Sequence, residues 1–515
     1  MAVKYLFYIF LASLPFGYRT TLYQFTAGFD EYEGVFLYAS DVLMVALLVA
    51  VWWRYYTQIA KHTPRWSFGE VGKSQTVSSW KSELPNIARR FLEFGLLKIW
   101  LLLFLFFSSL SIFWAPIPLL ALYNLGRLLL LALLCLAVSK LITYRLINLQ
   151  TIFGFLATLA VFESLIGFFQ FLFQQSLGLW FLGESILGPW VIGTAKFFIE
   201  GGSLVRAYGT FPHPNILGAF LLLGLASLYY FWLTRPSEKK IWAGLPVLQS
   251  DLLFGLTIFI VLSGIIFTFS RATWLIAIFL SLFTIGYSLL ARERWIQAVR
   301  LFFLLLATAY ILLTTFSPLI FPRAQISISE PAVSYRMSYN KIGSELIKAN
   351  PMGVGIGNQV IYSIKNDVYK NAGLTQVWEW QPIHNLYLLI ASEVGILGLL
   401  SLLGFLGTVM LCKIKNQKSK IKNTIQNVKL ENGAAPTSDV LNIDAPIFFG
   451  HRISRHWTFD CEPAHFIPKI MLISLLIFGM FDHFLWTLEP GRLMLWVTVG
   501  MVMGSSIVIN EGKYA

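Results

Sequence analysis

The chain has 515 residues, of which 57% are hydrophobic and 13% charged, and it contains 44 Phe and 17 Trp. This composition lies well outside the range of water-soluble domains and excludes an ordinary soluble enzyme. The net charge of +13 needs no nucleic-acid partner, because basic loops that face an anionic lipid leaflet account for it.

Apolar stretches long enough to cross the roughly 30 Å of membrane hydrocarbon recur along the whole chain. We therefore predict an all-α, polytopic membrane bundle of about twelve transmembrane helices, without a separate soluble catalytic domain. The predicted spans are 4–17, 34–53, 99–114, 117–139, 150–174, 214–233, 252–269, 272–291, 301–320, 384–411, 468–488 and 492–509.

The basic residues predict the orientation of these spans, because Lys and Arg favour the cytoplasmic side of a membrane. Segments such as "RPSEKK" and "KIKNQKSKIKNTIQNVK" fall on one side, and the alternate segments carry fewer basic residues for their length. This asymmetry predicts that both termini are cytoplasmic.

The same pattern divides the chain into parts. Residues 1–320 are expected to form a membrane domain with the first nine helices, and 384–411 and 468–515 the last three. The cytoplasmic insertion 412–467 is rich in Lys and Asn and is expected to be largely disordered.

The outer segment 321–383 has a different character and is predicted to be a partly helical lid. Its apolar side chains recur at helical spacing until Pro351 ends the pattern. They are expected to face the membrane domain and are Val333, Met337, Tyr339, Ile342, Leu346 and Ile347.

Basic side chains gather at the predicted outer surface. Arg206 precedes the sixth span, Arg271 lies between the seventh and eighth, and His384 begins the tenth. Asp482 and His483 end the eleventh span at the same surface, but the acidic groups are too few to pair with every cation. Arginine near a membrane needs an anionic partner or water, so each could merely reach to the interface. Together they favour a site for an anionic ligand such as a lipid diphosphate, because guanidinium binds phosphate oxygens in pairs.

Arg127, Glu163 and Glu393 are charged residues in the interior of predicted spans. Arg127 and Glu163 could pair with each other or line a polar channel. Glu393 lies away from His384 by helical spacing, which favours a buried structural hydrogen bond over catalysis. The glycines Gly395 and Gly398 favour close helix packing.

Four motifs, in this order along the chain, resemble the O-antigen ligase family. They are "RAYGTFPHPNILGAFLL", "SRATWL", "YRMSYNKIGSELIKANPMGVGIGN" and His384-Asn385 placed nine residues before "GILG". The resemblance covers most of the membrane domain. The chain departs from it at His213, where relatives vary, and in its long insertion.

The resemblance implies an inverting glycosyltransferase without a metal or other cofactor, acting at the outer face of the bacterial inner membrane. It would move a glycan from undecaprenyl diphosphate to a hydroxyl of a glycan, lipid or protein acceptor. Arg206 and Arg271 would hold the diphosphate, with Arg336 and Asn385 as further substrate-binding candidates, and His384 would be the catalytic base. The physics is consistent, because a diphosphate leaves easily when its charge is stabilised and histidine has a suitable pKa.

Two other functions remain open at this stage. The family includes O-antigen polymerases, which use the same donor, and some bicarbonate transporters. Clustering of the charges at one surface disfavours a transporter, whose site is expected near the midplane.

Overall fold

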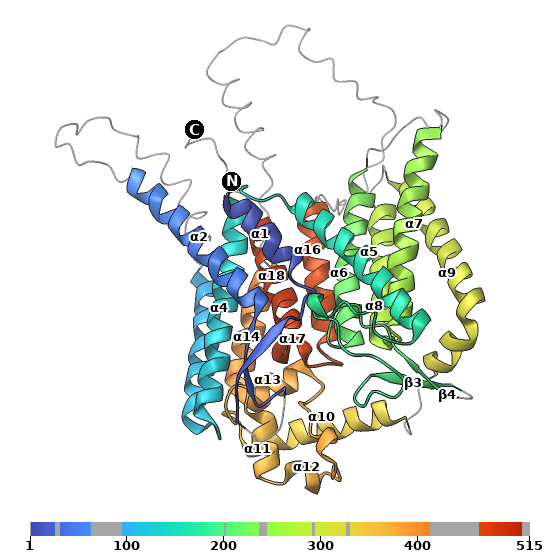
Figure 1. The fold of residues 1–515 in the computed structure, drawn as a ribbon. Coiled ribbons are helices and arrows are strands. Elements are labelled where there is room, and N and C mark those ends of the chain that lie inside the picture. Colours follow the sequence, from blue (N-terminus) through green and yellow to red (C-terminus); the bar gives the residue numbers. More distant parts are fainter. Residues whose placement is uncertain are drawn as a thin grey trace, which may run out of the picture. The chain divides into compact units, whose positions relative to one another are not determined.

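The computed structural model describes residues 2–25, 31–62, 95–199, 202–235, 245–290, 294–325, 330–411 and 463–506 (Figure 1). These residues belong to one compact unit. The insertion predicted to be disordered, 412–467, lies outside the described residues as far as residue 462.

Helices dominate the described residues. In chain order they are α1 (Ala2–Ala12), α2 (Ala39–His62), a helix within Gly95–Trp114, α4 (Pro118–Thr143), α5 (Leu149–Phe173), α6 (Pro214–Thr234), α7 (Leu245–Phe267), α8 (Arg271–Leu290), α9 (Trp295–Ala324), α10 (Pro331–Ala349), α11 (Gln359–Lys365), α12 (Val368–Asn371), α13 (Leu386–Val394), α14 (Ile396–Leu411), α16 (Pro463–Phe478), α17 (Phe484–Thr487) and α18 (Glu489–Ser506).

Six helices of the described residues are long and apolar enough to cross a membrane: Gly95–Trp114, α4, α5, α6, α8 and α9. Shorter apolar helices, among them α1, α14 and α16, accompany them. The predicted count of twelve spans is therefore not confirmed, although each predicted span overlaps a helix. Part of the difference is that two predicted spans are interrupted within their length.

The first interruption divides the predicted span 384–411 at Gly395, where α13 ends and α14 begins. Gly395 has φ +86°, and a Cβ there would lie 2.7 Å from the carbonyl carbon of Met352. The second divides 468–488, because α16 ends at Phe478 and α17 begins only at Phe484. Asp482 and His483 lie in that gap.

The prediction of an all-α chain is wrong in detail, because the described residues include two small antiparallel sheets. Strands β1 (Arg19–Gln24) and β2 (Gly34–Tyr38) form one hairpin, and β3 (Lys196–Ile199) and β4 (Gly202–Val205) form the other. The span predicted at 34–53 thus begins as a strand, and its helix runs from Ala39. Both hairpins lie in segments predicted as loops or span ends, where short strands leave little periodicity to read.

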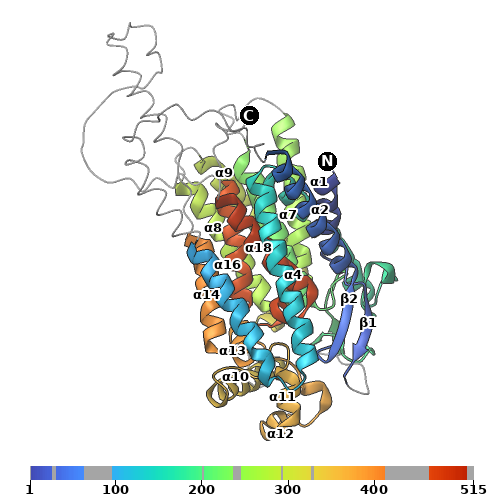
Figure 2. The same cartoon turned by 90° about the vertical axis from the view of Figure 1, so that its left-hand side faces the viewer.

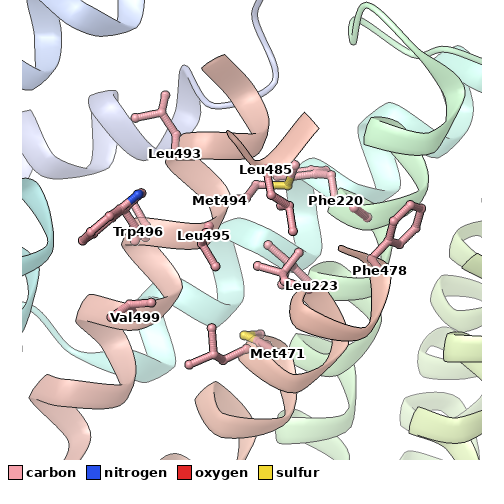
Figure 3. Packing of buried hydrophobic residues seen from close by; sticks show 14 of the residues in the cluster. Phe220, Leu223, Met471, Phe478, Leu485, Leu493, Met494, Leu495, Trp496 and Val499 are labelled. Carbon is pink, nitrogen blue, oxygen red and sulfur yellow. The ribbon is translucent and has the colours of Figure 1, made fainter. Parts of the chain in front are cut away.

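Close packing around α6 holds the bundle together. Most of α6 is buried, and a Cβ at Gly224 would overlap Ala160 of α5. Figure 3 shows Phe220 of α6 among side chains of α16 and α18, including Met471 and Leu495. Within lipid, van der Waals contact through small residues of this kind is the main source of helix association.

Helix α10 lies with α11 and α12 at the end of the described unit opposite the start of α1 (Figures 1 and 2). It packs on α13 through Tyr339, Ile342 and Leu346, which were predicted to face inward. Met337 was predicted to face inward too, but it is 58% exposed, because it lies on the far side of the contact face.

Candidate functional site

His384 lies in the segment that leads into α13, at the α10 end of the unit. Its Nδ1 is 2.9 Å from the carbonyl oxygen of Pro382, which can only accept a hydrogen bond. In the neutral ring, Nδ1 therefore carries the proton and Nε2 keeps its lone pair. The ring stacks on Tyr339 of α10 at 4.9 Å between centroids and meets the ring of His483 edge-on at 4.7 Å.

Asn385, and not His384, caps α13. Its Oδ1 accepts hydrogen bonds from the backbone N–H groups of Tyr387 and Leu388, at 3.0 and 3.1 Å. Its Nδ2 donates to the carbonyl of Met480 at 3.2 Å. Asn385 thus joins α13 to the gap after α16 and frees His384 from a capping role.

Asp482 and His483 complete this side of the site. Asp482 Oδ1 accepts from the backbone N–H of His483 at 2.8 Å, and its Oδ2 accepts from Asn215 Nδ2 at 2.6 Å. Asn215 Oδ1 in turn accepts from Arg206 Nη2 at 2.8 Å. A continuous chain of hydrogen bonds therefore connects the loop that carries His483 to Arg206.

Arg206 is buried in the segment between β4 and α6. Its Nε donates to the carbonyl of Thr268 at 2.7 Å. Burial, together with the charges of Arg323 and Arg336, lowers the pKa of Arg206 to about 9, so it stays protonated at neutral pH.

Two buried side chains of α5 fix the backbone after Arg206. Glu163 accepts from both the N–H and the hydroxyl of Thr210, each at 2.8 Å. Gln170 accepts from the N–H of Gly209 at 2.8 Å. The predicted pairing of Arg127 with Glu163 is wrong: Arg127 binds Asp41 and Glu489 instead, because α4 faces α2 and α18.

Arg271 and Arg323 share one carboxylate. Arg271 Nη2 and Arg323 Nη1 each lie 2.6 Å from a different oxygen of Glu330. Burial opposes ionisation of Glu330, but the hydrogen bond from Arg271 and the charge of Arg323 outweigh it and lower its pKa. Glu330 therefore cancels one of the two positive charges.

Arg336 projects from α10 and is half-buried. Its Nε is shielded from solvent and has no hydrogen-bond partner among the described residues. The charge of Arg336 acts on Arg206, Arg323 and His384. A buried guanidinium nitrogen without a partner is costly, which is the usual mark of a group that awaits a ligand.

We call Arg206, Arg271, Arg323 and Arg336 the guanidinium cluster. Asp482 and Glu330 are the acidic side chains that contact or neighbour it, so four positive charges face two negative ones. The surplus of positive charge favours an anion at this place, and the planar donors suit phosphate oxygens.

The histidines beside the cluster are held neutral. Burial lowers the pKa of His384, and the charge of Arg336 adds to this effect while Asp482 opposes it. The pKa of His483 falls to about 3, through burial first and then the charge on His384. Asp482 stays ionised at neutral pH. Its pKa lies well below its usual range despite its burial, because the neighbouring histidines are protonated at the low pH where Asp482 would titrate, and Arg336 adds to their effect.

Sequence reasoning brought Arg206, Arg271, Arg336 and His384 forward, and the structure gathers them at one end of the bundle. It did not identify Arg323, which follows Pro322 at the end of α9, or the bridging role of Asn215. For Arg323 a signal existed: a lone arginine at the end of an apolar span resembles Arg271 in its setting. Asp482 and His483 were noted at this surface without a role.

Comparison with known proteins was made on the whole chain. The family model described as O-antigen ligase matches residues 256–403. This part of the chain is similar to the O-antigen ligase family. No curated protein matches the chain.

The part matched by the O-antigen ligase model contains Arg271, Arg323, Arg336 and His384. Arg206, which the fold brings to the same place, lies outside it. This match and the apolar helices together indicate an integral membrane protein. They support a glycan-processing enzyme of the ligase or polymerase type, acting on a lipid-linked glycan and an acceptor.

Proposed function

We propose that the protein transfers a glycan from undecaprenyl diphosphate to an acceptor hydroxyl, as an O-antigen ligase. One observation carries the proposal: Arg336, without a partner among the described residues, lies in a guanidinium cluster beside a histidine that is held neutral. An anion site and a proton acceptor placed together are what such a transfer needs.

In the proposed complex, the guanidinium cluster binds the diphosphate of the donor. Arg336 would bind phosphate oxygens with the N–H groups of its guanidinium. Arg206 would supply a second positive charge, held in place by Asn215 and Thr268. The two phosphates gain negative charge as the bond to the sugar breaks. Donors aimed at that charge lower the barrier most, because they bind the transition state more tightly than the ground state.

His384 acts as the general base in this proposal. Its Nε2 takes the proton of the acceptor hydroxyl while the hydroxyl oxygen attacks the anomeric carbon. The bond from that carbon to the diphosphate oxygen breaks, and the electron pair leaves with the diphosphate. Attack from the face opposite the leaving group inverts the anomeric configuration.

Asp482 and His483 assist without touching the reacting atoms. The negative charge of Asp482 favours the imidazolium that forms when His384 takes the proton. His483 presses edge-on against the His384 ring and limits its rotation. Tyr339 supports the opposite face.

We place the protein in the bacterial inner membrane, with both termini cytoplasmic and the site facing outward. The excess of basic residues in the segments between spans on the opposite side supports this orientation. The helix α10 would then be the predicted lid over the site.

The test is transfer by the purified protein in lipid nanodiscs, supplied with undecaprenyl-diphosphate-linked glycan labelled in the sugar. We expect the label to move to a separate acceptor lipid. Label that accumulates instead in longer chains on undecaprenyl diphosphate would identify a polymerase. Arg336→Ala should bind undecaprenyl diphosphate poorly. Full donor binding by that variant, or no transfer at all together with bicarbonate uptake into vesicles, would contradict the proposal.

A further inference from the structure

A second polar pocket lies beside His483, where Tyr32 and Thr487 of its lining contact the ring. It encloses about 610 Å³, open solvent included, between β2, α4, α17 and the start of α18. None of the four arginines of the guanidinium cluster lines it.

The pocket contains an acceptor atom that nothing satisfies. Glu489 is 2% exposed, and its Oε2 accepts from Arg127 Nη2. Its other oxygen, Oε1, is shielded from solvent and has no partner among the described residues. A carboxylate oxygen in this state is satisfied when a ligand brings a hydrogen-bond donor.

Further polar groups stand beside Glu489. Arg492 Nη2 donates to Asn124 Oδ1 at 3.0 Å, and both residues line the pocket. The lining has carboxylates from Glu31, Glu393 and Glu489 against guanidiniums from Arg127 and Arg492. This mixture of donors and acceptors with little net charge differs from the guanidinium cluster and does not suit an anion.

Aromatic side chains form much of the remaining wall: Tyr32, Phe36, Tyr38, Tyr123 and Trp486. Flat apolar faces combined with carboxylate and amide groups suit a ligand that is apolar on one face and carries hydroxyls at its edge. A sugar ring has this chemistry.

The pocket adjoins the catalytic base. Thr487 lines it and lies 2.7 Å, Oγ1 to Nδ1, from His483, whose ring contacts His384. Tyr32 meets the ring of His483 edge-on at 6.0 Å. Pro382 also lines the pocket, and its carbonyl accepts the hydrogen bond from His384.

We infer that this pocket binds a carbohydrate ring of the acceptor, with a hydroxyl of that ring bonded to Glu489. The inference rests on the proposed function and adds the place and the chemical class of the second substrate. Donor and acceptor then occupy two different places near His384, one at the guanidinium cluster and the other in a nearly neutral, aromatic pocket.

The first experiment measures binding without catalysis. A thiol is introduced by Asn124→Cys in a Cys412→Ser, Cys461→Ser background, since the remaining Cys135 is buried. The probe is the deacylated, water-soluble oligosaccharide of the expression host's lipopolysaccharide. At a concentration about ten times its Kd, we expect the probe to slow maleimide labelling of this thiol about tenfold. A thiol introduced by Asn350→Cys should label at the same rate with and without the probe, because Asn350 lies outside the pocket.

The second experiment separates the two substrates kinetically. Tyr32→Ala and Glu489→Gln should raise the KM for the acceptor about tenfold and leave the affinity for undecaprenyl diphosphate unchanged. In Glu489→Gln the partner Arg127 keeps Asp41, so the variant is expected to fold. Asn350→Ala is the control and should leave the acceptor KM unchanged, because Asn350 does not line the pocket.

The outcomes distinguish this inference from the proposed function. If transfer proceeds but the probe gives no protection and neither variant changes the acceptor KM, the inference is wrong and the proposed function stands. If the probe protects the thiol but the parent protein transfers nothing, the carbohydrate pocket stands and the proposed function fails.

Discussion

Three neighbouring residues fix the tautomer and the orientation of the His384 ring. Pro382 fixes the tautomer, and Tyr339 and His483 fix the plane. His384→Gln keeps a hydrogen-bonding group of similar reach but has no useful proton acceptor. We expect transfer to fall by about 10²–10⁴-fold with donor affinity unchanged. The measurement is single-turnover transfer beside undecaprenyl diphosphate binding, and a folded variant that transfers at the parent rate would exclude His384 as the base.

The pH dependence follows from the same ring. Burial and the charge of Arg336 lower the pKa of His384, and the neutral ring is the active form. Activity should therefore persist as the pH falls through about 6.5, the ordinary value for histidine, and be lost only at lower pH. With Arg336→Ala at saturating donor the loss should move to higher pH, because a positive charge is removed. If the acidic limb of the pH–activity profile does not move in this variant, the charge of Arg336 does not affect the pKa of His384.

Arg336 and Arg271 should respond differently to replacement by lysine, which keeps the charge and removes the planar fork. Arg336→Lys should weaken donor binding by about 1–3 kcal/mol without lowering the melting temperature, because Arg336 has no partner to lose. Arg271→Lys should weaken donor binding and also lower the melting temperature, since Arg271 bonds Glu330 and the carbonyl of Gln325. Thermal unfolding and donor binding are measured on each variant. Arg235→Lys is the control for donor binding, because Arg235 lies at the end of α6 away from the site. Equal effects of the two variants would mean that Arg336 has a structural partner.

At the scale of the element, the break between α13 and α14 shapes the site. Gly395 allows the backbone of Gly353 and its neighbours to approach, and Gly355 N–H donates to the carbonyl of Glu393 at 2.9 Å. Glu393 itself accepts from Gly357 N–H and Trp486 Nε1, which confirms its predicted structural role. The segment before α11, α13 and α17 are joined through this one carboxylate.

Gly395→Ala should therefore destabilise the protein. The residue has φ +86°, and the new methyl group would meet the backbone of Met352. We expect a loss of about 1–3 kcal/mol, read as a lower melting temperature in detergent. Gly407→Ala is the matched control in α14: it has open space around it and should be neutral or slightly stabilising. The opposite order for the two variants would contradict this account.

The helices were predictable because each long apolar stretch carries its own signal. The interruptions at Gly395 and at Asp482 were not, since both lie within stretches whose mean hydropathy stays high and depend on contacts with distant segments. The two hairpins were missed for a similar reason, because four to six residues are too few to show alternation. The hydrophobic pattern of the sequence thus predicted where helices occur better than it predicted where they begin and end.

The site was predictable in its residue types and only partly in its partners. Lone arginines and a histidine at the ends of apolar spans are conspicuous, which brought Arg206, Arg271 and His384 forward. Which cations are neutralised depends on the fold. Glu330 pairs with Arg271 and Arg323. Asn215 bonds both Arg206 and Asp482, and Asp482 follows it by 267 residues in the sequence. Such pairings cannot be read from one sequence.

At the scale of the whole molecule, the charge distribution predicts the response to chelators. The guanidinium cluster supplies fixed positive charge where a metal ion would otherwise act. Transfer should therefore be unchanged by excess EDTA, measured after extensive dialysis. Loss of activity that magnesium or manganese restores would show that the arginines do not suffice to stabilise the leaving diphosphate.

Helix α10 carries both Arg336 and Tyr339, one turn apart. The side chain that would bind the donor and the ring that stacks on His384 therefore move together with this helix. A donor that draws Arg336 toward it must also move the support of the base. Occupancy of one substrate site then alters the affinity of the other, and the influence is reciprocal by thermodynamic necessity. Substrates would load in a preferred order, donor before acceptor, and the base would be fully aligned only when a leaving group is in place. The same linkage would suppress transfer of the glycan to water.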